Sequence, residues 1–260
     1  MERQPTTLPE NVIVAATKNR HKIREMEAIT ARFGMQIIAR DEAEVPDVEI
    51  VEDGKTFEEN SRKKAEGIMK LCGRPTIADD SGLEVDCLGG APGIYSARFA
   101  AMPDVELRDG TAAVCSPDKP APAPSPGVAA GTLLNAVSAD GAPDSAEIAP
   151  QEAPLADSDD KDNNRKLIRL IRDVPYEERT ARFVSAISIA FPEGETITVR
   201  GTVEGHVLPE ERGEGGFGYD PLFVPEGYDK TFGQLPAELK NRISHRANAL
   251  KKLEEELRRR

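Results

Sequence analysis

The sequence predicts a three-layer α/β fold with a mixed β-sheet. Two observations carry this prediction: strand and helix patterns alternate over roughly the first third of the chain, and a β-hairpin pattern follows later. At 260 residues the chain is long enough to bury a sizeable core without a disulfide or a structural metal.

The elements expected in the first third follow from the spacing of apolar residues. We expect, in order, a strand at 12–16, a helix at 23–33, a strand at 36–39, a helix at 56–71 and a strand at 75–79. Thr56 and Glu59 form a capping box at the start of the second helix. The strand at 75–79 is expected to end at the carboxylates of Asp79 and Asp80.

The last third of the chain carries four further patterns. We expect an amphipathic helix at 164–173, strands at 183–191 and 196–207, and a final helix from Ser244 to the C-terminus. The four residues 192–195 contain proline and glycine between the two strands, which predicts a hairpin.

An abrupt change of composition separates these two parts. Residues 116–160 contain 8 Pro, 11 Ala, 8 Asp or Glu, one Lys and no aromatic residue. Such a segment cannot bury enough apolar surface to offset the entropy of ordering it. We therefore expect a single domain over 12–260, preceded by a flexible N-terminus at 1–11 and interrupted by a disordered insertion at about 103–160.

The charge and the cysteines exclude several classes of protein. The net charge of -12, of which -7 belongs to the segment 116–160, argues against a nucleic-acid or anionic membrane surface. Three cysteines without a C-x-x-C pair are typical of a reducing compartment. The first apolar run is too short for a signal peptide or a membrane span, so a cytoplasmic protein is expected.

The junction between the first strand and the first helix is suited to an anion. Free N–H groups and the positive end of the helix dipole meet there. Thr17 and Asn19 can supply hydrogen bonds, and Lys22 a compact positive charge. The alternative interpretation is equally simple: Asn19 is only an N-cap and Lys22 a solvated lysine.

Acidic residues gather at two places. Asp79 and Asp80 follow a strand that has the pattern of a buried one, whereas Glu52 lies just before the second helix. Clustered carboxylates in a cleft need a cation, and hard oxygen ligands with few histidines favour magnesium. Helix caps and a solvated turn are the alternative explanation.

Two segments near the C-terminus can complete a binding site. Residues 215–221 form a glycine-rich loop with two aromatic rings that could stack on a base. His245 and Arg246 place two basic side chains in the first turn of the last helix. Positive charge is unfavourable at this end of the helix dipole, and a bound anion would relieve the repulsion. By contrast, Gly54-Lys55-Thr56 and the glycines Gly213, Gly215 and Gly218 lack the context of cofactor fingerprints.

Five motifs in this order resemble the inosine triphosphate pyrophosphatase family. They are Ala16-Thr17-x-Asn19-x-x-Lys22, Glu52-Asp53-Gly54-x-Thr56-Phe57-x-Glu59-Asn60, Ala78-Asp79-Asp80-Ser81-Gly82-Leu83 with Gly89 to Arg98, Gly215 to Pro221, and Ser244-His245-Arg246. The resemblance implies an elongated mixed sheet with flanking helices, two lobes with the nucleotide in the cleft between them, and a homodimer.

The resemblance also implies the roles of individual residues. Asp80 would be the catalytic base, and Glu52, Asp80 and Asp79 would serve Mg²⁺. Substrate contacts are implied for Thr17, Lys18, Asn19, Arg20, His21, Lys22, Ser81, Phe217, Gly218, Tyr219, Asp220, Lys240, His245 and Arg246. The reaction would convert inosine, deoxyinosine and xanthosine triphosphates into monophosphate and pyrophosphate.

Two other functions stay open at this stage. One is an aspartate-dependent phosphomonoesterase built on Asp79 and Asp80, although its D-x-D pattern is absent. The other is a nucleotide-binding module without catalysis, which would not need Glu52 and Asp80. The expected partner in each case is a small nucleotide or phosphate ester, not a nucleic acid or a membrane.

Overall fold

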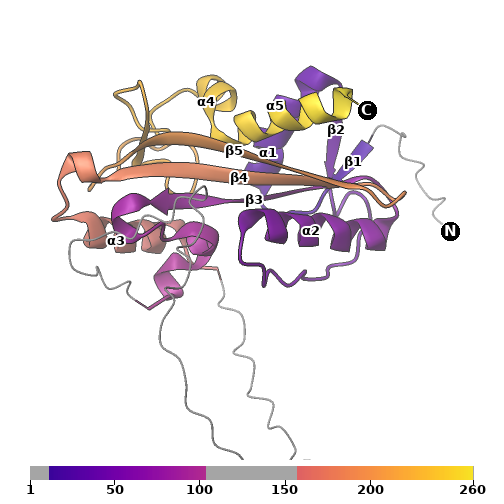
Figure 1. Cartoon of the computed structure of the whole chain (residues 1–260), viewed down its shortest axis with the longest axis horizontal. Helices are drawn as coiled ribbons and strands as arrows, with labels where there is room; N and C mark the ends of the chain where they lie inside the picture. Colours follow the sequence, from indigo (N-terminus) through magenta and orange to yellow (C-terminus); the bar gives the residue numbers. More distant parts are fainter. Residues whose placement is uncertain (1–11, 104–156, 260) are drawn as a thin grey trace, which may run out of the picture.

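A computed structural model describes residues 12–103 and 157–259, which form one six-stranded sheet. Helices lie on both faces of this sheet (Figure 1). The strands are β1 (Val12–Ala15), β2 (Gln36–Ala39), β3 (Thr76–Val85), β4 (Thr180–Ala190), β5 (Thr196–Val207) and β6 (Phe223–Pro225). The α-helices are α1 (Arg20–Thr30), α2 (Phe57–Cys72), α3 (Asp160–Ile171), α4 (Ala237–Ile243) and α5 (His245–Arg258). Short 3₁₀ helices are η1 (Ala31–Phe33), η2 (Asp86–Leu88), η3 (Gly93–Ala101) and η4 (Tyr176–Glu178).

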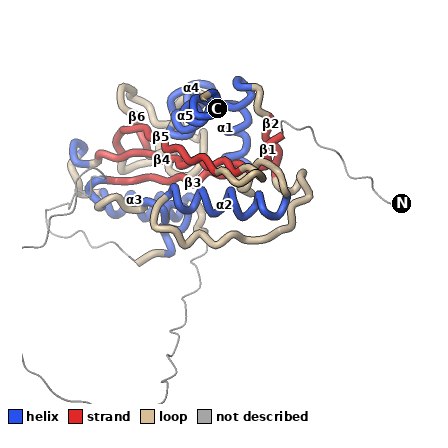
Figure 2. The backbone as a smooth tube through the Cα atoms, turned by 45° about the vertical axis from the view of Figure 1, so that its right-hand side comes forward, coloured by secondary structure: helices blue, strands red, loops and turns tan. Residues whose placement is uncertain are grey.

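The sheet is mixed, as the sequence predicts. Its strand order is β2-β1-β3-β4-β5-β6, in which β1 is parallel to β2 and to β3, and the remaining neighbours are antiparallel. The helices α1, α4 and α5 cover one face, and α2 and α3 cover the other (Figure 2). The α/β class with a mixed sheet and flanking helices is therefore confirmed.

Alternation along the strands explains the three layers. On β1, Ile13 and Ala15 pack with the apolar faces of α1 and α5, whereas Val12 and Val14 pack with α2. A further core cluster at the other end of the long strands joins η3, α3 and β6. The chain thus buries apolar side chains on both faces of one sheet.

Local signals predicted several boundaries correctly. Thr56 accepts a hydrogen bond from the Glu59 N–H group (3.1 Å), and the Glu59 carboxylate accepts one from the Lys55 N–H group (2.7 Å). The hairpin between β4 and β5 closes where it was expected, with the Phe191 N–H group donating to the Glu195 carbonyl (3.0 Å).

Two boundaries were predicted wrongly. The strand expected at 75–79 continues to Val85, because β4 pairs with it along its whole length, so Asp79 and Asp80 lie inside a strand and not at its end. The expected insertion extends too far: α3 begins at Asp160, Asp159 caps it, and the Ser158 N–H group donates to the Ala97 carbonyl (2.8 Å). The expected N-terminal segment 1–11 and the rest of the insertion, 104–156, lie outside the described residues.

No helix in 12–103 or 157–259 is long and apolar enough to cross a membrane.

Candidate active site

Asp79 and Asp80 divide the site into two parts, because consecutive residues of a strand point to opposite faces. Asp79 lies on the side of α1 and α5, where it contacts Lys22 and Arg246. Asp80 lies on the side of α2, where it contacts Lys64. The two carboxylates that look like one acidic pair in the sequence therefore have separate surroundings.

Asp79 is buried and saturated with donors. Its oxygens accept from Arg246 Nη2 (2.9 Å), from Ser185 Oγ (2.5 Å) and from Ser81 Oγ (3.0 Å), and Lys22 Nζ lies 3.1 Å away. Burial alone would raise the pKa of Asp79, but Arg246 and Lys22 hold it well below its usual range. Asp79 therefore stays ionised and fixes the positions of two cations.

Asp80 has a different environment. Its Oδ1 accepts from Lys64 Nζ (2.9 Å), which also donates to Glu52 Oε2 (3.1 Å). The Oδ2 atom is buried and has no hydrogen-bond partner. Burial raises the pKa of Asp80 although Lys64 and Lys22 oppose it, so this carboxylate is suited to hold a proton or a cation.

Lys64 was missed by the sequence analysis. Burial alone would lower its pKa, but Asp80 and Glu52 together raise it, so the ammonium stays charged. A signal was present: Lys64 lies on the stripe of α2 that carries the buried residues Asn60, Ala65 and Ile68. A lysine on a buried helix face needs a carboxylate partner.

The carboxylates of Glu52 and Asp80 are of the kind that binds magnesium. Glu52 and Asp80 share one ammonium, and the unpartnered Asp80 oxygen is a free hard ligand beside them. The described residues contain no group of three or more His, Cys, Asp or Glu that could enclose a metal ion. Two carboxylates fit Mg²⁺, which usually keeps several waters and takes the remaining oxygens from phosphates. Asp79 does not share this set, because its partners are Arg246, Lys22 and two serines.

The N-terminus of α1 shows which interpretation of its residues holds. Asn19 is an N-cap: its side-chain oxygen accepts from the N–H groups of His21 (2.9 Å) and Lys22 (3.2 Å). Thr17 Oγ1 accepts from the Asn19 N–H group (3.1 Å). Lys22 is not a solvated lysine, since its side chain is only 16% exposed and its ammonium lies against Asp79.

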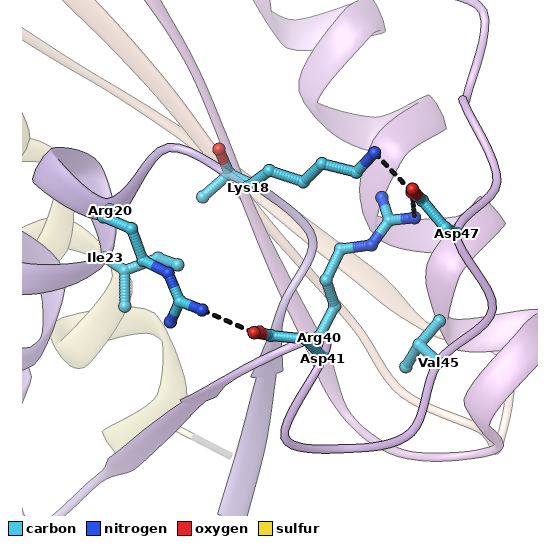
Figure 3. Close-up of a pocket in the computed structure, with 8 residues that line it drawn as sticks. Lys18, Arg20, Ile23, Arg40, Asp41, Val45 and Asp47 are labelled. Atoms are coloured by element: carbon cyan, nitrogen blue, oxygen red, sulfur yellow. Dashed lines mark hydrogen bonds and ion pairs between the residues drawn. The ribbon is translucent and has the colours of Figure 1, made fainter.

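A hollow of about 340 Å³ opens beside this helix end, between the ends of β1 and β2 (Figure 3). Lys18 pairs with Asp47 on one side of it, and Arg20 pairs with Asp41 on the other. Arg40, which is nearly buried, lines the same hollow and donates to the Val48 carbonyl (2.8 Å). The predicted residues Thr17, Lys18 and Arg20 therefore share one basic recess.

A second hollow, of about 360 Å³, lies between α1 and the loop 215–217. The ring of Phe217 stacks on His21 with the centroids 5.4 Å apart, and Lys240 Nζ lies 4.9 Å from the same ring. Lys240 donates to Asp220 (2.5 Å) and to Glu25 (2.7 Å). An aromatic wall beside an ammonium is suited to a polar heterocycle.

Glu25 was also missed, although it follows His21 and Lys22 by one helical turn. Its carboxylate bridges Lys240 and Arg246 and so connects the second hollow with the Asp79 group. Burial alone would raise the pKa of Glu25, but Arg246 and Lys240 lower it. The conflict expected in the first turn of α5 is thus relieved by carboxylates of the protein itself.

Other predicted residues lie deeper. Ser81 donates a hydrogen bond to Asp79 and accepts one from Arg246 (3.0 Å). Asp220 is buried, and its carboxylate accepts a hydrogen bond from the Phe217 N–H group (2.8 Å). His245 is buried against the Phe183 ring, and burial and Arg246 lower its pKa well below the usual range, so it is neutral. Tyr219 donates to the Ser96 carbonyl (2.8 Å) and packs in the core, and burial raises its pKa.

Known proteins match this chain over nearly its whole length. The model of the Ham1 family matches residues 13–118 and 133–256, and the gap falls within the segment expected to be an insertion. A dITP/XTP pyrophosphatase of Desulforamulus reducens is 39% identical over 248 residues, covering 95% of this chain and 96% of the relative. One of Bacillus cereus is 36% identical and covers 94% of both chains.

Solved structures agree with the sequence relatives. The Staphylococcus aureus Ham1 protein matches with a TM-score of 0.66 and 33% identity, covering 95% of this chain and 98% of the other. A nucleoside-triphosphatase, dITP/XTP pyrophosphatase, from Mycobacterium abscessus matches with a TM-score of 0.60 and 30% identity over 93% and 98% of the two chains. The similarity therefore extends over nearly the whole chain.

Proposed function

The chain belongs to the Ham1 family, and on this premise we propose that it hydrolyses non-canonical purine nucleoside triphosphates to a monophosphate and pyrophosphate. The relatives are named for dITP and XTP, and inosine triphosphate shares the same 6-oxo group. One observation carries the proposal for this chain. A buried carboxylate with an unpartnered oxygen, Asp80, lies beside Glu52 and Lys64, and the ammonium groups of Lys64 and Lys22 both donate to the carbonyl of the preceding residue, Asp79.

Glu52 and Asp80 would hold Mg²⁺. When bound, the ion supplies positive charge to the phosphoryl oxygens and to the leaving group. Lys64 donates to Glu52, to Asp80 and to the Asp79 carbonyl, so it keeps the two carboxylates together and adds positive charge near the phosphate oxygens. We assign Asp79 a different task from the metal ligand implied by the resemblance: it holds Lys22 and Arg246 in place.

The triphosphate would lie along the N-terminus of α1. Lys22 and the positive end of the helix dipole favour an anion there, while the Asn19 side chain caps the N–H groups of His21 and Lys22. Lys18, Arg20 and Thr17 line the basic hollow next to it, where the distal phosphates would lie. A phosphate entering this hollow would take over the ion pairs that Lys18 and Arg20 make with surface carboxylates.

The base would stack on Phe217 in the second hollow, near His21 and Lys240. The Lys240 ammonium can donate to the 6-oxo group of hypoxanthine or xanthine. The 6-amino group of adenine would instead face this ammonium as a second donor, and a buried mismatch of this kind rejects a substrate strongly. Asp220 accepts from the Phe217 N–H group and so holds this wall, whereas Tyr219 and His245 pack deeper, against the Ser96 carbonyl and the Phe183 ring.

The reaction balances as a hydrolysis of the α–β anhydride. The water oxygen bonds to the α-phosphorus while the bond from this phosphorus to the bridging oxygen breaks. Asp80 accepts the proton of the water, and pyrophosphate leaves with the bridging oxygen. Positive charge from Lys22 and Lys64 stabilises the oxygens that become more negative during the transfer.

Three further features are proposed with the activity. The enzyme acts as a homodimer in the cytoplasm, and its domain consists of two lobes. The lobes correspond to the core clusters at the two ends of the sheet, and the second hollow lies between segments from both. Size-exclusion chromatography with light scattering tests the dimer, and a monomeric mass would reject it.

The test is a product assay with Mg²⁺ and the triphosphates of inosine, deoxyinosine, xanthosine, adenosine and guanosine. We expect pyrophosphate from the first three, and a loss of rate of about a hundredfold or more in Asp80→Asn because the proton acceptor is removed. Asp53→Asn is the matched control, since Asp53 is exposed and pairs with Lys63.

Four results would contradict the proposal. The first is the absence of pyrophosphate from the triphosphates of inosine, deoxyinosine and xanthosine, and the second is an unchanged rate in Asp80→Asn. The third is orthophosphate as the product, which would indicate a phosphomonoesterase, and the fourth is binding without turnover, which would indicate a nucleotide-binding module.

A further inference from the structure

Gly218 is held by α3 at both of its backbone polar groups. Its N–H group donates to Asp160 Oδ2 (2.7 Å), and its carbonyl accepts from Asn164 Nδ2 (3.2 Å). Asp160 and Asn164 are four residues apart on one helix, so they lie on the same face. Gly218 has a φ of +61°, in the left-handed region, which glycine adopts about as readily as the negative-φ regions. This conformation is therefore fixed from outside the loop.

The helix that supplies these contacts, α3, is itself held by hydrogen bonds to neighbouring segments. Asn163, which is buried, accepts from the Ala100 N–H group (2.7 Å) and donates to the Ala97 carbonyl (3.3 Å). Asn164 is also buried and donates in addition to Glu211 Oε1 (2.7 Å). The two neighbouring asparagines thus connect α3 to η3 on one side and to the loop 211–218 on the other.

The position of Gly218 determines the position of the Phe217 ring. The N–H group of Phe217 donates a hydrogen bond to the Asp220 carboxylate (2.8 Å), which holds the backbone on the N-terminal side of the ring. On its C-terminal side the Phe217 carbonyl accepts from the Asp220 N–H group (3.3 Å), and the next backbone contacts are those that α3 makes with Gly218. The ring forms a wall of the second hollow, opposite His21 and Lys240. A rotation about Gly218 would therefore change the distance between the ring and the Lys240 ammonium.

We propose that Asp160 and Asn164 are positioning residues that set the selectivity for the base by fixing Gly218, and with it the Phe217 wall. The proposal rests on the proposed function, since it assigns the second hollow to the purine. Neither residue touches the substrate or the reacting phosphate in this arrangement. Their removal should therefore affect discrimination between bases more than the chemical step.

The main variant is Asp160→Ala, which removes the acceptor at an exposed position where folding is not endangered. Asp160→Asn keeps an oxygen acceptor and serves as the rescue. Asp162→Ala is the control on the same turn of α3, because its carboxylate pairs with Arg165 of that helix. Asn164→Ala removes the second contact. For each protein we would measure kcat and KM for inosine and adenosine triphosphates and the hydrogen exchange of the segment 216–220.

We expect Asp160→Ala to exchange faster at 216–220 and to lower the ratio of kcat/KM for inosine over adenosine triphosphate by about tenfold, mainly through KM, because small misplacements in a binding site have large effects. Asp160→Asn and Asp162→Ala should stay within about twofold of the wild type. The proposal is overturned if Asp160→Ala leaves the ratio of kcat/KM for the two substrates unchanged, whether or not the exchange of 216–220 becomes faster.

A failure of the proposed function can be told apart from a failure of this inference. If the wild type releases no pyrophosphate, the proposed function has failed, and the ratio of dissociation constants for the two nucleotides, measured by calorimetry, tests the positioning role instead. A lower binding ratio in Asp160→Ala supports the inference, and an unchanged one rejects it.

Discussion

The clearest test of the buried charge network is Glu25→Gln. The Glu25 carboxylate lies between Lys240 (2.7 Å) and Arg246, and the side chains of these two cations are 5% and 0% exposed. Glutamine keeps the shape and removes the charge. Each cation retains one carboxylate, since Lys240 still has Asp220 and Arg246 still has Asp79.

The expected loss can be estimated from this arrangement. Breaking a buried ion pair by removing one partner destabilises a protein by about 3–5 kcal/mol. Because both cations keep a partner, we expect the lower end of this range, about 3 kcal/mol at pH 7. In a urea titration this corresponds to a decrease of the midpoint by about 1–2 M. The chain contains no tryptophan, so far-ultraviolet circular dichroism is the appropriate probe.

The stabilisation by ionised Glu25 should depend on pH. The pKa of Glu25 is lowered from its ordinary value of 4.5, because the attraction of Arg246 and Lys240 outweighs the effect of burial. The stabilisation is therefore fully present above pH 4.5 and is lost as the pH falls through the lower pKa of the folded state. The difference in unfolding free energy between the wild type and Glu25→Gln should shrink accordingly below pH 4.5.

Glu27→Gln is the matched control, since Glu27 is exposed on the same helix. Such a surface change should alter the unfolding free energy by less than about 0.5 kcal/mol. The reasoning is refuted if the two variants unfold at the same urea concentration at pH 7. It is also refuted if the difference between Glu25→Gln and the wild type stays constant down to pH 3.

Two other predictions concern activity. Removal of divalent cations with EDTA should abolish pyrophosphate release, and added Mg²⁺ should restore it. Glu52 and Asp80 supply only two protein ligands and leave the other positions of the ion to water and phosphate, so EDTA can remove the ion. Activity that survives EDTA would contradict the assignment of Glu52 and Asp80. A chain without residues 119–132, which the family model leaves unmatched, should keep kcat/KM within about twofold, since changes of loop length have small entropic effects; a large loss would show that this segment contributes to the site.

Short-range patterns predicted much of the fold. The alternation of β1, the apolar stripe of α1, the capping pair Thr56 and Glu59, and the hairpin turn at 192–195 each depend on residues within one turn or one strand. The motifs likewise selected Lys22, Asp80 and Lys240, and the structure places each of them beside a group of opposite charge. The assignment of these residues to substrate and metal stays a prediction.

The wrong boundaries have a common cause. The pairing of β3 with β4 extends the strand past Asp79 and Asp80, and the partner strand is about a hundred residues away in the sequence. Asp160 was placed in the insertion by composition, yet its contact with Gly218 fixes it in the fold. Composition and periodicity describe a segment alone and contain no information about which distant backbone groups will meet it.

The sequence by itself determined which elements form and which chemical groups are available, because hydrophobic spacing and capping act over a few residues. Only the tertiary structure decided how those groups are paired. Asp79 and Arg246 are 167 positions apart and Glu25 and Lys240 are 215 apart, yet each pair is in contact. Such contacts also shift the pKa values of Asp79, Glu25 and Lys64. The extension of β3 places Asp79 and Asp80 on opposite faces of the sheet, and tertiary contacts bring Lys64, Glu25 and Asp160 to the candidate site or to the loop beside it.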